Sequence, residues 1–112
     1  MTEPRRVLLD ECVPARLRRH LPGFAVTTVR GHGWASKLNG DLIRAAEAEF
    51  DVFVTVDRNL VLQQNMQLVR IPVVVMLARS NRLRDLLPLV PELIGVLQRI
   101  SAGEIVYVPA AR

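Results

Sequence analysis

Cysteine and long apolar runs are almost missing from this 112-residue sequence. The single cysteine, Cys12, cannot form a disulfide within the chain, and with His20 and His32 it is too little for a zinc site of the usual ligand number. No apolar run approaches the roughly 20 residues of a membrane span, and residues 1–6 lack the apolar stretch of a signal peptide. We therefore expect a cytoplasmic protein with no membrane segment.

Lysine is scarce as well, because Lys37 is the one lysine among 15 basic residues and all the others are arginine. The net charge of +4 permits a polyanionic partner, and arginine suits phosphate, although coding composition can also cause an arginine bias. Half of the residues are hydrophobic, which indicates a globular chain. The length, without repeats or linkers, predicts one domain over residues 1–112.

Short, uniformly apolar segments alternate with helical ones along the chain. Strands without polar alternation are typical of parallel sheets that are buried on both faces. We predict strands over 5–9, 24–29, 52–56, 71–77 and 104–108, and helices over 14–20, 39–50, 59–67 and 83–100, the last with a late start or a kink at Pro88 and Pro91.

This alternation predicts an α/β fold with three layers and an open, mostly parallel sheet of four to five strands. We expect the strand order 2-1-3-4, with the fifth strand at the edge. Ligands of such sheets bind outside the carboxyl ends of the strands, where the strand order reverses. Here that position lies between the first and third strands.

Acidic residues stand at this position. Asp10 follows the first strand, Asp57 follows the third, and Asp41 opens the helix that should begin near the same edge. Carboxylates close together need a proton, an arginine or a hard cation, and oxygen ligands favour Mg²⁺ or Mn²⁺. Glu11 is a secondary candidate ligand. Each acid also has a plain structural role open to it, since Asp57 could cap the next helix and acids such as Asp41 are ordinary in a first helical turn.

Three segments in this order resemble the acidic motifs of PIN and PIN-like domains. They are Leu8-Leu9-Asp10-Glu11, Gly40-Asp41-Leu42-Ile43-Arg44-Ala45-Ala46 and Val54-Thr55-Val56-Asp57-Arg58-Asn59-Leu60. The similarity runs from about Val7 to Ala78 and is greatest to short PIN-like proteins grouped with VapC-type toxins. The resemblance implies a Mg²⁺- or Mn²⁺-dependent ribonuclease with Asp10, Asp41 and Asp57 as metal-binding catalytic acids. It also implies a cognate antitoxin protein and a homodimer, to which helix 83–100 could contribute.

Basic and aromatic residues near the same edge are candidates for contact with RNA. We expect Arg16, Arg30, Arg58 and Arg79 to bind nucleic acid, against the alternative that they form a solvated basic surface. Trp34 and His32 lie in the longest predicted loop, where they could stack on a base. Trp34 could equally anchor this loop on the core.

Two other functions remain open. Asn59 stands where the family often has a further acid, so the chain could be a PIN-like module that binds a partner without catalysis, and Asn59 is at most a secondary, neutral ligand. A receiver-like phosphoacceptor domain would use Asp10, Glu11, Asp57 and Ser80. It also needs a lysine after the fifth strand, whereas Lys37 lies in the loop after the second.

Overall fold

The structure is a computed structural model that describes residues 3–37, 39–63 and 70–110. Its centre is a sheet of five parallel strands in the order β2-β1-β3-β4-β5. These strands are β1 (Arg6–Leu9), β2 (Ala25–Thr28), β3 (Val52–Thr55), β4 (Val73–Met76) and β5 (Ile105–Val108). The predicted α/β class and strand order are therefore confirmed, and the sheet is entirely parallel.

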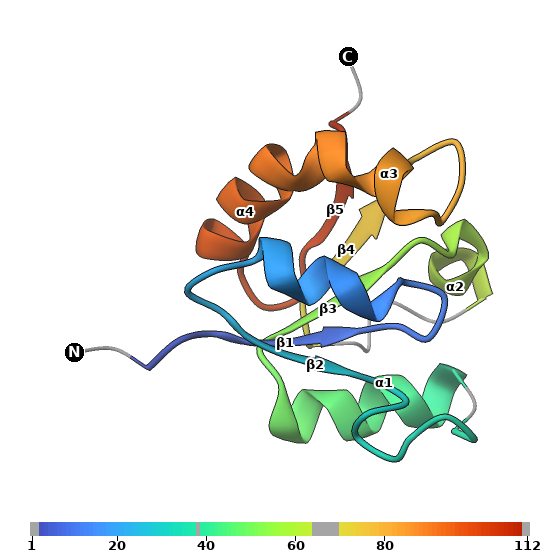
Figure 1. Cartoon of the computed structure of the whole chain (residues 1–112). Helices are drawn as coiled ribbons and strands as arrows, with labels where there is room; N and C mark the ends of the chain where they lie inside the picture. Colours follow the sequence, from blue (N-terminus) through green and yellow to red (C-terminus); the bar gives the residue numbers. More distant parts are fainter. Residues whose placement is uncertain (1–2, 38, 64–69, 111–112) are drawn as a thin grey trace.

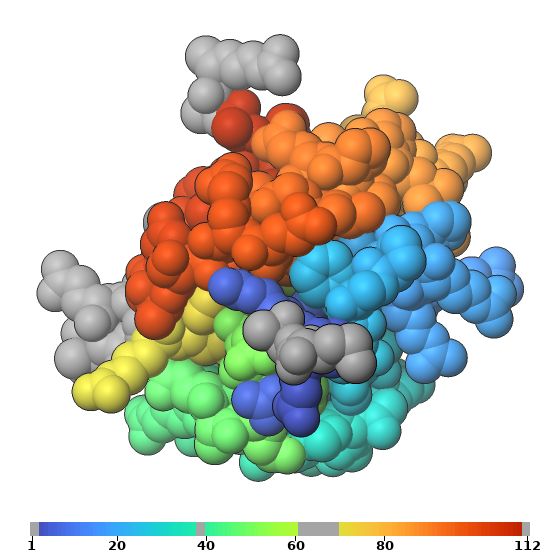
Figure 2. All heavy atoms as spheres, turned by 90° about the vertical axis from the view of Figure 1, so that its left-hand side faces the viewer, coloured from blue at the N-terminus to red at the C-terminus, as the bar shows by residue number. Residues whose placement is uncertain are grey.

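Helices cover both faces of this sheet (Figure 1). The 3₁₀ helix η1 (Ala15–His20) and the helices α3 (Leu83–Leu86) and α4 (Val90–Arg99) lie on one face, and α1 (Asn39–Glu49) lies on the other. The short helix α2 (Arg58–Gln63) follows β3, and its Leu60 packs on the α1 side. Figure 2, viewed from the side of the amino ends of the strands, shows the two helical layers with the first described residues, in dark blue, between them.

Alternate residues of the central strands pack into two separate hydrophobic cores, one on each face of the sheet. Val7 and Leu9 of β1 pack under η1 and α4, whereas Leu8 packs under α1. β3 divides in the same way, since Val54 faces the first core and Phe53 the second. Burial on both faces explains why these strands are continuously apolar in sequence.

The helices differ from the prediction in two places. Segment 15–20 is a 3₁₀ helix, in which Leu17 N donates to Pro14 O and Leu21 N to Arg18 O, each across three residues. The predicted helix 83–100 is divided into α3, a 3₁₀ turn η3 (Leu87–Leu89) and α4. Pro88 and Pro91 stand at the starts of η3 and α4, where a missing N–H costs least, so each proline begins a new segment.

Two other predictions concern membranes and pairing of subunits. Within the described ranges, no helix has both the length and the apolarity that a membrane crossing requires. The buried residues of α4 all pack in the core beneath it: Val90, Leu93, Val96 and Leu97. The apolar side of this helix is therefore used within the chain, and the homodimer stays a prediction. Residues 64–67 of the predicted helix 59–67 lie outside the described residues.

Candidate functional site

Asp10 is the centre of the candidate site, at the carboxyl end of β1. Only 9% of its surface is exposed, and Asp10 N donates to Val54 O, so the β1–β3 pairing continues to this residue. Asp10 Oδ1 accepts from the backbone N of Glu11 at 2.8 Å. Asp10 Oδ2 accepts from Thr55 Oγ1 at 2.8 Å and from Cys12 Sγ at 3.4 Å. All three donors are neutral.

Thr55 connects the ends of β1 and β3. Its side chain is fully buried, and its hydroxyl donates to Asp10 while accepting from the backbone N of Asp57 at 3.0 Å. The segment that bears Asp57 is thereby fixed to Asp10 through one oxygen atom. Sequence reasoning missed this residue, although Thr55 is the one polar side chain in Val52–Val56.

Cys12 keeps its proton in this environment. Burial, the largest cause, raises the pKa of the thiol above its ordinary value, and the charge of Asp10 adds to the increase. Hydrogen bonds from the backbone of Val56 and from Thr55 act in the opposite direction but do not reverse it. A protonated thiol can donate to Asp10, so Cys12 serves as a third neutral donor to the buried carboxylate.

Asp57 has a local partner of its own. Asp57 Oδ1 accepts from Asn59 N at 2.9 Å, at the start of α2. This is the contact of a helix cap, one of the two roles that the sequence left open. Asn59 is exposed and contacts Asp57 through its backbone N.

Asp41 lies in the first turn of α1 and is exposed. Figure 1 shows that α1 begins on the side of the sheet toward which the strands point, as the right-handed connection predicts. Asp41 therefore shares this edge with Asp10 and Asp57. Among the described residues, however, no three His, Cys, Asp or Glu side chains form a group arranged to hold a metal ion.

Glu11 and Arg30 form an ion pair outside Asp10. Arg30 Nη2 lies 3.3 Å from Glu11 Oε1, and the Arg30 side chain is 81% exposed. A pocket of about 400 Å³ opens between them and Asp10, with Val13, Pro14 and Ala15 along one side. Glu11 thus lines the same pocket as Asp10 while its carboxylate pairs with Arg30.

Gly31 borders this pocket and is constrained by Thr28. Its backbone N donates to Thr28 Oγ1 at 2.9 Å, and a Cβ at position 31 would lie 2.7 Å from that same oxygen. A larger residue would displace the hydroxyl and the loop it holds. The absence of a side chain at Gly31 therefore preserves the shape of the pocket wall beside Asp10.

The predicted nucleic-acid contacts lie on the surface. Arg16, Arg30, Arg58 and Arg79 are all exposed. Trp34, by contrast, is half-buried against the α1 side of the core, edge-to-face with His32 at 4.4 Å and Phe50 at 5.9 Å between ring centroids. His32 also lies 3.2 Å from Glu49 Oε1. These contacts fit the anchoring role of Trp34.

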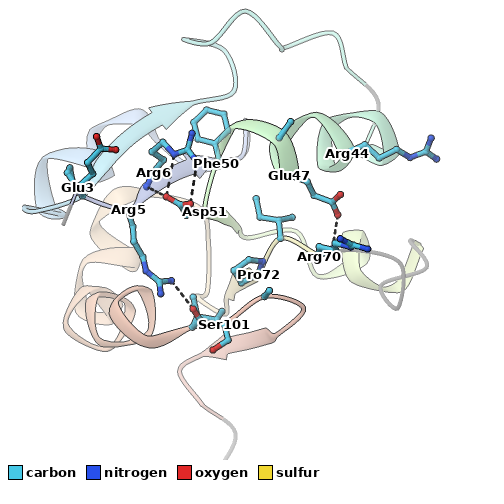
Figure 3. Close-up of a pocket in the computed structure, with 15 residues that line it drawn as sticks. Glu3, Arg5, Arg6, Arg44, Glu47, Phe50, Asp51, Arg70, Pro72 and Ser101 are labelled. Carbon is cyan, nitrogen blue, oxygen red and sulfur yellow. Dashed lines mark hydrogen bonds and ion pairs between the residues drawn. The ribbon is translucent and has the colours of Figure 1, made fainter.

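A larger hollow, of about 890 Å³, lies at the opposite, amino ends of the strands (Figure 3). Its polar groups largely engage one another: Arg6 pairs with Asp51, and Arg5 Nη1 donates to Ile100 O at 2.8 Å. In Figure 3 the side chain of Arg44 extends away from the hollow. None of the predicted acids lines it.

The chemistry of the Asp10 site suits a hard divalent cation. Within the described part of the chain Asp10 forms no ion pair, so its charge is balanced only by neutral donors. Mg²⁺ commonly binds through one or two carboxylates, with water and substrate phosphate as its other ligands. A cation at this position would have Asp10 as its buried carboxylate ligand, and no group of three His, Cys, Asp or Glu within the described ranges completes a protein cage around it.

Comparison of the chain with protein-family models, with curated proteins and with solved structures gives no match.

Proposed function

We propose that the carboxyl end of the sheet is the site of a Mg²⁺- or Mn²⁺-dependent ribonuclease of the PIN-like toxin type. The observation that carries the proposal is the environment of Asp10, a carboxylate only 9% exposed at the strand-order reversal, whose partners are all neutral. A buried charge without a cationic partner is costly, and a bound cation relieves that cost.

Asp10, Asp41 and Asp57 would hold the ion, with Glu11 and Asn59 as further oxygen ligands. A bound Mg²⁺ or Mn²⁺ supplies Lewis-acid stabilisation of a phosphodiester and a more acidic water. Thr55 orients Asp10 through its 2.8 Å hydrogen bond and holds the backbone of Asp57. The burial of Asp10 limits water access and so strengthens its interactions with charge.

The substrate in this proposal is RNA in the cytoplasm, with Arg16, Arg30, Arg58 and Arg79 as its phosphate contacts. By resemblance, a cognate antitoxin protein would restrain the enzyme, and the chain would act as a homodimer.

Cleavage of a labelled RNA by the Asp10→Asn variant tests the proposal. We expect wild-type cleavage with Mg²⁺ or Mn²⁺, none with EDTA, and cleavage at background for Asp10→Asn. Asp51→Asn is the matched control, because it removes an equal charge at the opposite end of the sheet. Undiminished cleavage by Asp10→Asn would exclude this site.

A binding module without catalysis is the second candidate. It is favoured by the local hydrogen bonds that satisfy both Asp10 and Asp57, and by the lack of a three-residue metal group within the described residues. This candidate predicts that the wild type and Asp10→Asn bind the same partner and that neither cuts RNA.

A receiver-like domain predicts instead that acetyl phosphate labels Asp57. Lys37 does not favour this function, since its Nζ lies 5.6 Å from the centre of the Trp34 ring, in the loop between β2 and α1.

A further inference from the structure

The loop that connects β4 to α3 gathers three arginines at the same end of the sheet as Asp10. Arg79, Arg82 and Arg84 line a pocket of about 520 Å³ together with Ser80 and Asp85. All three arginines are exposed, and within the described residues none of them forms an ion pair. The residues outside the described ranges include no aspartate or glutamate. The loop therefore presents three positive charges to solvent.

The loop carries its own hydrogen bonds, which hold its backbone in place. Ser80 Oγ donates to Asp85 Oδ2 and accepts from the backbone N of Arg82 at 3.0 Å. The one acid of the loop is thus turned to Ser80 and not to an arginine. Because the loop is already ordered, less entropy is lost when a ligand binds to it.

Asn81 attaches this loop to the candidate site. Its Nδ2 donates to Cys12 O at 3.0 Å, two residues from Asp10. β3 lies between β4 and β1 in the sheet, so the loop must reach across the end of β3, about 10 Å for two strand spacings. The loop therefore contacts the segment that follows Asp10, although it belongs to a distant part of the sequence.

The composition of the pocket indicates which kind of partner it fits. All five residues that line it are polar or charged, namely Arg79, Ser80, Arg82, Arg84 and Asp85. Protein partners usually require a buried aromatic or aliphatic anchor, which this lining does not offer. Contacts to a nucleic-acid backbone depend instead on arginine forks and hydroxyl donors.

We propose that segment 79–85 is a backbone-binding loop that holds an RNA strand beside Asp10, with Arg79, Arg82 and Arg84 on phosphates. This inference rests on the proposed ribonuclease function and adds Arg82, Arg84 and the positioning residue Asn81 to it. Asn81 acts through the loop, because its hydrogen bond to Cys12 O keeps the position of the arginines fixed relative to Asp10.

RNA binding by an Asp10→Asn protein tests the loop separately from cleavage. Fluorescence anisotropy with a labelled single-stranded RNA would be measured at several salt concentrations, for the parent variant and for the added triple change Arg79→Ala, Arg82→Ala and Arg84→Ala. We expect the triple variant to bind at least about tenfold more weakly at low salt. The slope of log K against log salt should fall by about 2, since each lost phosphate contact removes about 0.7.

The matched control is the triple change Arg44→Ala, Arg70→Ala and Arg99→Ala, which removes the same charge from exposed arginines outside the loop. It should leave the salt slope close to that of the parent. Equal losses in both triple variants would overturn the proposal, because net charge alone would explain them. Unchanged RNA binding in the loop variant would also overturn it and would leave an acidic protein as the partner of the loop. Equal urea midpoints for the parent and the loop variant would confirm that the triple change leaves the fold intact.

Asn81→Ala in the wild-type background tests the positioning role. We expect the rate of cleavage at saturating RNA to fall while RNA affinity changes by less than about threefold. The three arginines keep their charges, but their position relative to Asp10 is no longer fixed. A parallel loss of affinity and no loss of maximal rate would contradict this role. If RNA is cut but the loop variants behave as wild type, the loop inference fails and the ribonuclease stands. If the loop binds RNA and no chain cuts it, the ribonuclease fails.

Discussion

Thr55 is a buried hydroxyl that takes part in two hydrogen bonds, one to Asp10 Oδ2 and one from Asp57 N. Both partners lie at the carboxyl ends of the two strands that flank the strand-order reversal. A single oxygen atom thereby links the carboxylate of Asp10 to the backbone of Asp57. The arrangement of the strand ends at this site therefore depends on the hydroxyl of Thr55.

Thr55→Val should destabilise the protein by about 1 to 3 kcal/mol, because valine fills the space of threonine but leaves the buried Asp10 oxygen and the Asp57 N–H without this partner. Urea unfolding would measure the loss. Thr55→Ser keeps the hydroxyl and removes a methyl group, so it should cost less, about 1 kcal/mol. A valine variant as stable as the wild type would show that neither hydrogen bond contributes.

The sequence was sufficient to predict that Asp10 and Asp57 share one edge, because an acid directly after a buried parallel strand can lie nowhere else. It did not predict the Thr55 and Cys12 contacts, which depend on strand register and on side-chain rotamers. The hydrogen bond of Asn81 to Cys12 could not be predicted either, since the two residues lie 69 positions apart in the sequence. Convergence of Asp41 with the other two acids stays a prediction.

Among the elements, β1 and β3 are joined at both ends. At the carboxyl ends the link is Thr55 with Asp10, and at the amino ends it is Arg6 with Asp51. Arg6 N donates to Asp51 Oδ2 at 2.8 Å, and Asp51 N donates to Arg6 O at 2.7 Å. An aspartate side chain therefore forms a hydrogen bond between β1 and β3 at each end of this strand pair.

Asp51 should make stability depend on acid pH. Burial alone would raise the pKa of its carboxyl, but the hydrogen bonds and charge of Arg6, with the charge of Arg5, lower it below the ordinary 3.8. A carboxyl with a lowered folded pKa contributes stability above its unfolded pKa and loses it as pH falls through the folded value.

We therefore expect the urea midpoint of the wild type to fall between pH 5 and about pH 3 by more than that of Asp51→Asn. In free energy of unfolding, the two proteins should differ in this loss by up to about 1 kcal/mol, because the side chains of Arg6 and Asp51 are about half exposed and solvent screens the pair. Identical pH profiles for the two proteins would contradict a contribution from Asp51.

The order of the elements was predictable because connection rules leave few arrangements for strands that alternate with helices. The hydrogen-bond pattern within the helices and the points at which they divide were harder to predict. Leu17 in segment 15–20 and Leu21 directly after it have the four-residue spacing of an α-helix, yet the hydrogen bonds span three residues. Pro88 and Pro91 signalled an interruption of helix 83–100, and the structure resolves it into three short segments.

Across the whole molecule, the two ends of the sheet differ in chemistry. The amino ends hold acids that engage basic side chains or backbone N–H groups, such as Asp51 with Arg6 and Glu47 with the backbone of Arg70. The carboxyl ends hold Asp10, which has no cationic partner within the described residues, and the pocket lined by the three arginines of segment 79–85. In the proposed ribonuclease, Asp10 would hold the cation and these arginines would bind phosphates of the RNA.

Titration of the protein with Mn²⁺, followed by electron paramagnetic resonance of the free ion, tests this central claim most directly. We predict that the wild type and Asp51→Asn bind Mn²⁺ alike, that Asp57→Asn binds it more weakly, and that Asp10→Asn loses the site. Binding by Asp10→Asn equal to that of the wild type would contradict the account.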